Sequence, residues 1–298
     1  MISKLYGIHV PTITVFRSDG AVDADAIKAL AGRFVEAGAS CLVPTANNGE
    51  QPHLSVEEKK LVWQANLEAA AGKAAVVPSV TMNTTAEVIE LAKVAQSMGA
   101  AGVMVAPPFY FRLNEAEAYE YYRDIAEAID IPVMIHNEPG VFKTDITPGL
   151  VEKLSRIDNI CLIKESTENT QRVHEIIRLC GDRMTVVVAG GGTALESMLL
   201  GAKAWMTGLI NIIPEIAVEM YNLAVVEGKF DEAKKVYFEK ILPVHSLMKE
   251  IGRPVPTVKY AVELVTGIPA RGTRKPMLPL AESDMEKVKK TLKEIGVL

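Results

Sequence analysis

Residues Cys161–Ser166, with the sequence Cys-Leu-Ile-Lys-Glu-Ser, place a lysine at the end of a short apolar run. If this run is a buried strand, Lys164 lies where the strand leaves the core, and partial desolvation of its ammonium group lowers its pKa. A neutral amine is what a Schiff-base nucleophile requires. The alternative is a lysine on an edge strand whose head group stays in water. The rest of the chain has to decide between these two interpretations.

Apolar runs of the same kind recur along the chain and alternate with segments of helical periodicity. We expect strands at Gly7–Val10, Cys41–Pro44, Ala75–Val80, Gly102–Ala106, Pro132–His136, Ile160–Lys164, Thr185–Ala189 and Ala204–Thr207. We expect helices between them at Asp25–Glu36, Val56–Ala71, Thr85–Met98, Glu115–Ala128, Pro148–Arg156, Gln171–Leu179 and Thr193–Leu200. Repeated strand–helix units are typical of a parallel sheet, and near-continuous apolar strands indicate that both faces of the sheet are covered.

Eight such units in roughly 220 residues fit a closed (β/α)8 TIM barrel. An open doubly wound sheet is the alternative, but no GxGxxG motif follows the first strand. After about residue 210 the pattern changes to helices at Pro214–Glu227, Phe230–Glu250, Thr257–Val265 and Ser283–Ile295, with linkers at Gly252–Pro256 and Ile268–Pro279. We therefore expect a barrel domain over residues 1–225 and a small helical C-terminal extension over residues 226–298.

The composition limits the kinds of partner. The 298-residue chain has a formal net charge of -5 and contains no basic stripe or polybasic cluster, which argues against nucleic acid and membrane surfaces. No apolar run approaches the roughly 20 residues that span a bilayer, and the first residues lack the features of a signal peptide. The histidines are scattered and the three cysteines form no CxxC pair. We expect a cytoplasmic protein that binds a small molecule and uses no metal or cofactor.

Polar and glycine residues follow the predicted strands at the end where such a barrel carries its active site. The segment Asn47–Glu50 forms either a plain turn or a set of amide groups that holds a carboxylate. Gly190–Gly192 is either a turn or a place where the backbone approaches a ligand closely. His136 is either a buried core residue or a proton carrier beside Lys164.

Four segments, taken in order, resemble the dihydrodipicolinate synthase / N-acetylneuraminate lyase family. They are Ala46–Glu50, Pro108–Tyr110, His136–Pro139 and Ile163–Glu165. The likeness covers essentially the whole chain. It implies a (β/α)8 barrel, usually a homotetramer of paired dimers. It also implies a class I lyase mechanism, in which the lysine of the sixth strand forms a Schiff base with a 2-keto acid such as pyruvate.

The resemblance also assigns roles to particular residues. Lys164 matches the nucleophile, and Asn47 and Asn48 match residues that bind the carboxylate of the 2-keto acid. Tyr110 matches a tyrosine that, in the synthases, reaches into the site of the neighbouring subunit. We expect His136 and Tyr110 to handle protons. The residues expected to shape the far end of the pocket are Gly190, Gly191 and Asn211.

Three features depart from the family pattern. Asn47 and Asn48 stand where the second loop of the family usually carries Thr-Thr or Ser-Thr. His136 stands where synthases and neuraminate lyases carry a proton-relay tyrosine, and Val141 stands where synthases carry an arginine that holds a carboxylate. The Ala-Asn-x-x-Glu-Gln sequence of residues 46–51 resembles 2-keto-3-deoxy sugar-acid dehydratases, and residues 139–145 faintly resemble hydratase-aldolases of arylidene pyruvates.

We therefore expect a 2-keto-3-deoxy sugar-acid dehydratase or aldolase. One alternative is a dihydrodipicolinate synthase in which His136 replaces the relay tyrosine. The other is a non-catalytic barrel that binds a keto acid or a sugar acid, although a protein that only binds has no need of a buried amine.

Overall fold

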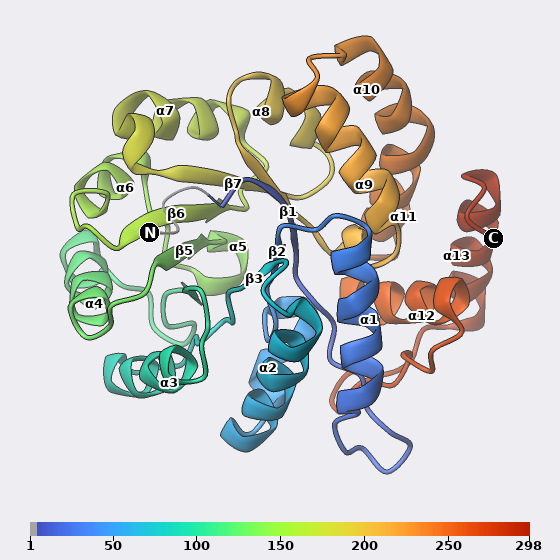
Figure 1. The fold of residues 1–298 in the computed structure, drawn as a ribbon, viewed down its shortest axis with the longest axis horizontal. Coiled ribbons are helices and arrows are strands. Elements are labelled where there is room, and N and C mark those ends of the chain that lie inside the picture. Colours follow the sequence, from blue (N-terminus) through green and yellow to red (C-terminus); the bar gives the residue numbers. More distant parts are fainter. Residues whose placement is uncertain (1–4) are drawn as a thin grey trace.

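A ring of parallel strands forms the centre of the computed structural model, which describes residues 5–298 (Figure 1). The strands are β1 (Gly7–Val10), β2 (Cys41–Leu42), β3 (Ala75–Val76), β4 (Val103–Val105), β5 (Val133–Asn137), β6 (Ile160–Glu165), β7 (Thr185–Ala189) and β8 (Ala204–Met206). They pair in the order β3-β2-β1-β8-β7-β6-β5-β4. A parallel bridge between Ser79 and Met104 joins the β3 end of this sheet to the β4 end. The predicted (β/α)8 barrel is therefore confirmed.

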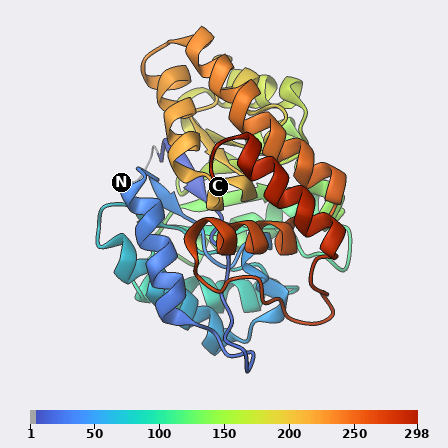
Figure 2. The same cartoon turned by 90° about the vertical axis from the view of Figure 1, so that its right-hand side faces the viewer.

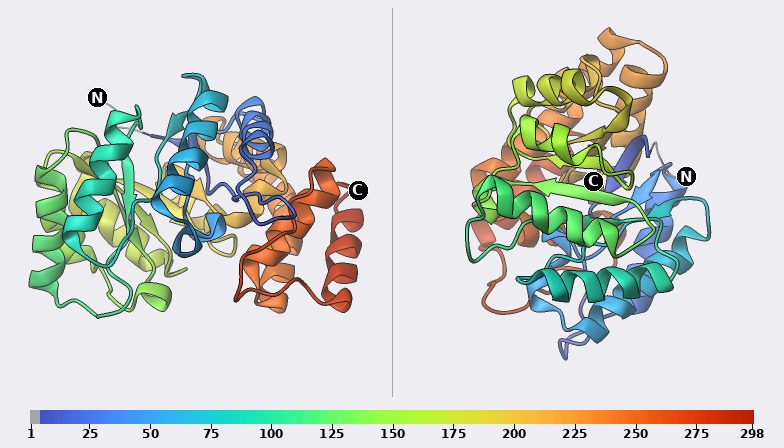
Figure 3. Two further views of the ribbon diagram at one scale, coloured as in Figure 1. Left: turned by 90° about the horizontal axis from the view of Figure 1, so that it is seen from below. Right: turned by 90° about the vertical axis from the view of Figure 1, so that its left-hand side faces the viewer.

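Helices surround the ring (Figures 1 and 3). The α-helices of the barrel are α1 (Ala24–Glu36), α2 (Val56–Ala70), α3 (Thr85–Ser97), α4 (Glu115–Glu127), α5 (Pro139–Phe142), α6 (Pro148–Leu154), α7 (Thr170–Cys180), α8 (Ala194–Leu199) and α9 (Pro214–Tyr221). Short 3-10 turns are η1 (Asn47–Gly49), η2 (Gln51–His53), η3 (Gly181–Arg183) and η4 (Gly208–Asn211). None of the helices in residues 5–298 combines the length and the apolar character that crossing a membrane requires.

The C-terminal part of the chain is helical and lies against one side of the barrel (Figures 2 and 3). It contains α10 (Phe230–Val236), α11 (Leu242–Ile251), α12 (Pro254–Thr266) and α13 (Glu282–Glu294), together with the π-helical turns η5 (Asn222–Val226) and η6 (Tyr237–Ile241). Helix α13 packs on α11 and α12. The expected domain boundary at residue 225 lies inside η5. This boundary stays a prediction.

Prolines account for the clearest differences from the expected elements. The predicted linker Gly252–Pro256 is wrong because α12 begins at Pro254, where a missing N–H costs a helix nothing. The short helix α5 was not expected and likewise begins on a proline, Pro139. The single helix expected over Phe230–Glu250 contains the turn η6 directly before Pro243, which removes a helical hydrogen bond.

Side chains alternate along each strand between the barrel interior and the surrounding helices. The inner core includes Met134 of β5 and Leu162 of β6, whereas Ile135 and Ile163 belong to the outer core between strands and helices. The same alternation places the next inward positions, His136 and Lys164, on top of the inner core. These two residues therefore lie at the carboxyl end of the barrel interior.

Candidate active site

Lys164 and His136 are neighbours because of the register between β5 and β6. In that pairing the Cα atom of His136 lies opposite the Cα atom of Lys164. The Lys164 Nζ atom lies 2.7 Å from His136 Nε2. The Lys164 side chain is 11% exposed, and His136 is buried. The strand ends therefore hold an amine and an imidazole in direct contact, with the amine open to the adjoining cavity.

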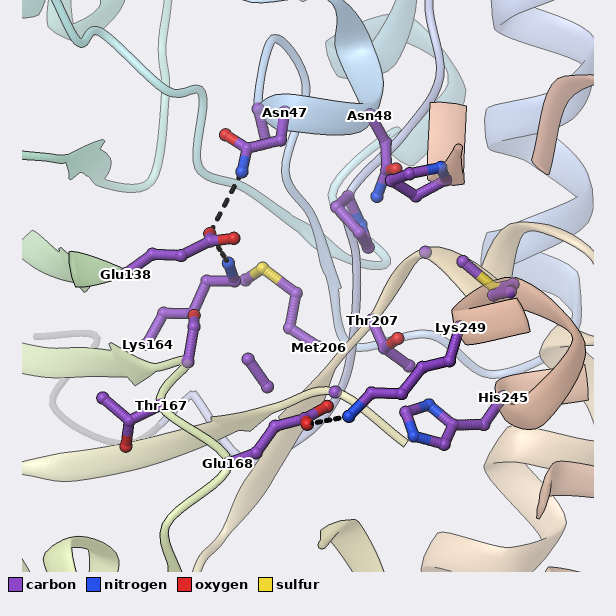
Figure 4. A pocket seen from close by; sticks show the side chains of 18 of the residues that line it. Asn47, Asn48, Glu138, Lys164, Thr167, Glu168, Met206, Thr207, His245 and Lys249 are labelled. Carbon is purple, nitrogen blue, oxygen red and sulfur yellow. Dashed lines mark hydrogen bonds and ion pairs between the residues drawn. The ribbon is translucent and has the colours of Figure 1, made fainter. Parts of the chain in front are cut away.

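Glu138 completes this cluster and was not among the predicted site residues. Its Oε2 atom lies 2.8 Å from His136 Nε2 and 3.2 Å from Lys164 Nζ. The same oxygen accepts a hydrogen bond of 3.0 Å from Asn47 Nδ2 (Figure 4). One carboxylate oxygen thus contacts the side chains from three strand ends. The only signal for Glu138 before the structure was indirect, since this residue lies inside the His136–Pro139 segment that carries the family likeness.

Burial and charge fix the protonation of this cluster. Burial, together with the positive charge of Lys164, lowers the pKa of His136 from 6.5 to about 4. Burial acts to raise the pKa of Glu138, but the charge of Lys164 and the hydrogen bond with His136 outweigh it, so this pKa lies well below its ordinary value. At neutral pH the imidazole is therefore uncharged and the carboxylate is ionised.

The loop after β2 carries Asn47 and Asn48 between two residues with unusual backbone conformations. Thr45 and Glu50 flank the two asparagines and both have left-handed backbone angles, with φ of 56° and 55°. Such conformations are strained for residues other than glycine and persist only where the surroundings enforce them. For Thr45 these surroundings include Trp63, whose Nε1 donates a 2.9 Å hydrogen bond to the threonine hydroxyl.

Asn48 lies against the backbone of the loop after β8. A Cβ atom added at Gly208 would lie 3.0 Å from Asn48 Nδ2, so only glycine leaves this amide enough room. The Asn48 side chain also lines a cavity, described next, in which its amide can donate a hydrogen bond to a bound group.

Two cavities open around the cluster. The first, of about 450 Å³, is lined by Lys164, Glu138, Asn47, Asn48 and Gly190, and it extends to His245 and Lys249 on α11 (Figure 4). The second, of about 380 Å³, is lined by Asn47, His136 and a set of apolar side chains that includes Phe109, Val141 and Phe142. Lys164 thus borders the first cavity and His136 the second, and Asn47 borders both.

Four predicted site residues do not line the first cavity: His136 lines only the second one, and Tyr110, Asn211 and Gly191 line neither. The Tyr110 side chain is 72% exposed and packs edge-on against Phe111. Asn211 is buried, and its amide bonds the backbone of Ile13, Pro11 and Gly208, so it ties the first strand end to the last. Gly191 faces His245 instead of the cavity. Asn211 and Gly191 thus do not line the cavity themselves, and the role of their loops in shaping the far end of the pocket stays a prediction.

No group of three or more histidine, cysteine, aspartate or glutamate side chains within residues 5–298 is arranged to hold a metal ion. The cysteine thiols are not candidates for nucleophiles either, because burial raises the pKa of Cys161 to about 11 and that of Cys41 further still. The amine, the imidazole and the carboxylate described above meet at the strand ends, and Glu168, His245 and Lys249 also line the first cavity.

Comparison with known proteins places this site in a family. Residues 4–295 match the model of the Dihydrodipicolinate synthetase family. The chain belongs to this family. The 4-hydroxy-tetrahydrodipicolinate synthase of Psychrobacter sp. (strain PRwf-1) is 33% identical over 296 residues, which cover 99% of this chain and 97% of that protein. The synthase of Halorhodospira halophila is 33% identical over 93% of this chain and 91% of its own length.

Solved structures of family members have the same fold. A dihydrodipicolinate synthase from Acinetobacter baumannii, complexed with pyruvate, superposes with a TM-score of 0.94 at 29% identity and covers 99% of this chain and 100% of its own. YagE from E. coli K12, also in complex with pyruvate, gives a TM-score of 0.93 at 25% identity and covers 98% of this chain and 99% of its own. This member of the dihydrodipicolinate synthase family is accordingly a lyase of the class I type.

Proposed function

We propose that Lys164 forms a Schiff base with the keto carbon of a 2-keto acid. The observation that carries this proposal is the contact of the Lys164 amine with both His136 Nε2 and Glu138 Oε2 at the wall of a cavity. An ammonium group cannot attack a carbonyl, so the amine must first lose a proton; the neutral His136 imidazole is in contact to accept it, and the ionised Glu138 carboxylate stabilises the charge that this creates. The free amine then adds to the keto carbon, the hydroxyl group of the adduct takes up the proton held by His136 and leaves as water, and the nitrogen electron pair forms the C=N bond of the iminium ion.

The iminium ion acts as an electron sink for the neighbouring carbon. A base removes a proton from C3, which gives an enamine, and the electron pair of the enamine then expels the hydroxyl group from C4. This hydroxyl takes up a proton and leaves as water, and hydrolysis of the remaining imine restores Lys164. In an aldolase the C4 hydroxyl instead loses its proton, the C3–C4 bond breaks, and C3 is protonated after an aldehyde has left.

His136 is suited to move the proton in either sequence. Its imidazole is neutral at pH 7 and can accept a proton, and with a pKa of about 4 the resulting imidazolium gives the proton up readily. Glu138 acts beside it by stabilising positive charge on the imidazole and on the Lys164 nitrogen. The carboxylate of the substrate would lie by Asn48 and the backbone at Gly208, on the side away from the negative charge of Glu138.

We propose a 2-keto-3-deoxy sugar acid as the substrate. Val141 occupies the position at which the family resemblance would require an arginine for a second carboxylate, and it is half exposed next to Phe142. His136 likewise replaces the relay tyrosine. The second candidate is 4-hydroxy-tetrahydrodipicolinate synthase, the activity named for relatives that are 33% identical over nearly the whole chain.

A substrate panel separates these functions. The purified protein is incubated with 2-keto-3-deoxy acids of five and six carbons, and products are identified by mass, which distinguishes loss of water from release of an aldehyde. A parallel assay supplies pyruvate and aspartate semialdehyde. Turnover of a sugar acid that disappears in Lys164→Arg is the expected result. Turnover in the second assay alone supports the synthase, and no turnover in either supports a protein that only binds such acids.

We also propose that the chain assembles as a homotetramer through a surface that includes Tyr110. The side chains of Tyr110 and Phe111 are 72% and 71% exposed, next to each other in the loop after β4. Large exposed aromatic pairs of this kind are typical of protein interfaces. Light scattering of the wild type and of Tyr110→Ser tests the proposal, and a monomeric wild type would contradict it.

A further inference from the structure

The segment between β5 and α6 leaves the barrel with Glu138 and returns at Ile146, and four polar side chains join its two ends. They belong to Asn137, Asp145, Glu165 and Arg172. We call these four residues the loop-base network. Resting on the proposed function, we infer that Arg172 is a positioning residue, which acts through this network to hold Glu138 in contact with the Lys164 amine.

Asn137 joins the two ends of this segment. It is the last residue of β5, it is fully buried, and it directly precedes Glu138. Its Oδ1 atom accepts a 2.9 Å hydrogen bond from the backbone N–H of Ile146, and its Nδ2 atom donates a 2.9 Å hydrogen bond to Glu165 Oε2. Glu165 is also buried and ends β6, opposite Asn137 in the strand pairing. The start and the end of the segment are therefore both tied to the strand that carries Lys164.

Arg172, near the start of α7, binds the far end of the segment. Its two terminal nitrogens donate to the two carboxylate oxygens of Asp145, at 2.8 Å and 3.2 Å, and one of them also donates at 3.0 Å to the backbone carbonyl of Ile146. The same nitrogen lies 3.6 Å from Glu165 Oε2. A bidentate arginine–carboxylate pair fixes direction as well as distance. Arg172 thus supplies the positive charge that offsets both carboxylates of the network, and its removal leaves a buried carboxylate uncompensated.

The network lies behind the strand ends and not in the space for a substrate. Successive side chains of a strand point to opposite sides. His136 points into the barrel interior, so Asn137, which follows it, points outward. Glu165 points outward for the same reason, since it follows Lys164. None of the four network residues lines either of the two cavities described above. Arg172 can therefore influence the reaction only through the backbone that it holds.

The segment needs such an anchor because its backbone is strained. Lys143, which directly follows α5, has a left-handed φ of 62°, an uncommon conformation for a residue other than glycine. Such a conformation persists only where the surroundings enforce it. Glu138 reaches both Lys164 and His136 from this segment (Figure 4). A misplacement of about 1 Å in a catalytic group can cost about a hundredfold in rate, so a loosened segment would impair the reaction.

A double-mutant cycle tests whether Arg172 acts through Glu138. The rate of imine formation with pyruvate is measured by borohydride quenching at successive times and by peptide mass. We expect Arg172→Ala to slow this rate about ten- to a hundredfold. In the Glu138→Gln background the same change should slow it by no more than about threefold, because two changes that remove one contact are not additive. Equal losses in the two backgrounds would overturn the inference.

Two further variants separate positioning from stability. Arg172→Lys keeps the charge that offsets the two carboxylates but loses the bidentate geometry, so imine formation should slow severalfold. Binding of lactate, which cannot form an imine, should keep its wild-type affinity because the network lies outside both cavities. Arg183→Lys is the matched control, since Arg183 contacts Glu152 and the backbone carbonyl of Leu179 near the other end of α7. A wild-type rate in Arg172→Lys, or an equal loss in Arg183→Lys, would overturn the inference.

Nitrogen NMR of His136 gives a reading that does not depend on turnover. Glu138 Oε2 lies 2.8 Å from His136 Nε2, so a displaced carboxylate changes the signals of the ring nitrogens. We expect Arg172→Lys and Glu138→Gln to move these signals in the same direction, and Arg183→Lys to leave them in place. Unmoved signals in Arg172→Lys would overturn the inference. Failure of the Schiff-base proposal shows separately, as absence of any imine in the wild type while the His136 signals still respond to Arg172→Lys.

Discussion

Two lysines of this protein are paired with a glutamate in a buried setting, and only one of them faces a cavity. Lys259 of α12 pairs with Glu50 at 2.5 Å, and both side chains are 0% exposed. Lys164 pairs with Glu138 at 3.2 Å, with side chains that are 11% and 24% exposed. Lys259 borders neither of the two cavities, whereas Lys164 opens into the first, where a substrate would lie.

The Lys259–Glu50 pair belongs to a buried cluster that also contains Phe16 and Arg274, and we call this cluster the clamp. The Lys259 ammonium lies 4.5 Å from the centre of the Phe16 ring, and Glu50 also accepts a 3.0 Å hydrogen bond from the backbone of Arg274. Burial lowers the pKa of Lys259, although Glu50 acts in the opposite direction. The clamp connects the C-terminal helices to the loop that carries Asn47.

The comparison shows that burial alone does not make a lysine reactive. Lys164 differs from Lys259 in having access to a cavity and in touching an imidazole that can take its proton. We therefore propose that Lys164 carries out the chemistry and that Lys259 contributes to stability.

The largest effect is expected from Lys164→Arg, which keeps a positive charge but cannot form an imine at neutral pH. Turnover of whichever 2-keto acid the panel identifies should fall by at least about 10⁴-fold, or about 5.5 kcal/mol in the activation barrier. The thermal unfolding midpoint should change little, because the side chain borders a cavity. Steady-state kinetics and calorimetry measure the two quantities, and a variant retaining more than a hundredth of the activity would contradict the assignment.

Lys259→Met should show the opposite pattern. Removing one partner of a buried ion pair leaves an uncompensated charge, which lowers the free energy of unfolding by about 3–5 kcal/mol. Adding Glu50→Gln should recover much of this loss because the unpaired charge is then gone. Urea denaturation of both variants measures the effect. If Lys259→Met kept the stability of the wild type, the clamp would have no structural role.

Acid sensitivity extends the comparison to two histidines, His9 in the closed core and His136 at the cavity. Burial lowers the pKa of each from 6.5 to about 4. Between these values the unfolded chain binds more protons than the folded chain, so stability falls as the pH drops from about 6.5 to about 4, by up to about 3 kcal/mol for each histidine. Denaturation across this range should show a shallower slope in His9→Gln and in His136→Gln than in the wild type. Unchanged slopes would show that these rings are protonated in the folded state.

A smaller effect is expected from Glu138→Gln, which keeps the size of the side chain and removes its charge. Turnover should fall about ten- to a hundredfold, since the neutral amide cannot stabilise positive charge on His136 or on the Lys164 nitrogen. The exposed Glu127→Gln is the matched control. Pre-steady-state trapping should show that imine formation has slowed; if only product release changed, the role given to Glu138 would be wrong.

The barrel and the position of Lys164 followed from local sequence. Short, near-continuous apolar runs predicted each strand, and the pairing of β5 with β6 then required His136 and Lys164 to be neighbours. Val43 and Pro44 were expected to continue β2, but the chain already turns at Thr45 with a positive φ. Single-sequence patterns do not reveal such strain, because the packing that enforces it is tertiary.

Other parts of the site could not be predicted for the same reason. His245 and Lys249 come from α11, about 80 residues after Lys164, and only the path of the C-terminal helices brings them to the cavity. Asn211 follows the last strand like the other rim residues, yet the turn η4 directs its amide into the backbone. Sequence order gives the strand end on which a residue lies, but not the direction in which its side chain points.

Borohydride reduction in the presence of pyruvate tests the central claim most directly. The treated protein is digested, and the lysine that carries the reduced adduct is identified by peptide mass. We expect one adduct, on Lys164, and none on Lys259. No adduct on any lysine, or an adduct elsewhere with Lys164 unmodified, would contradict it.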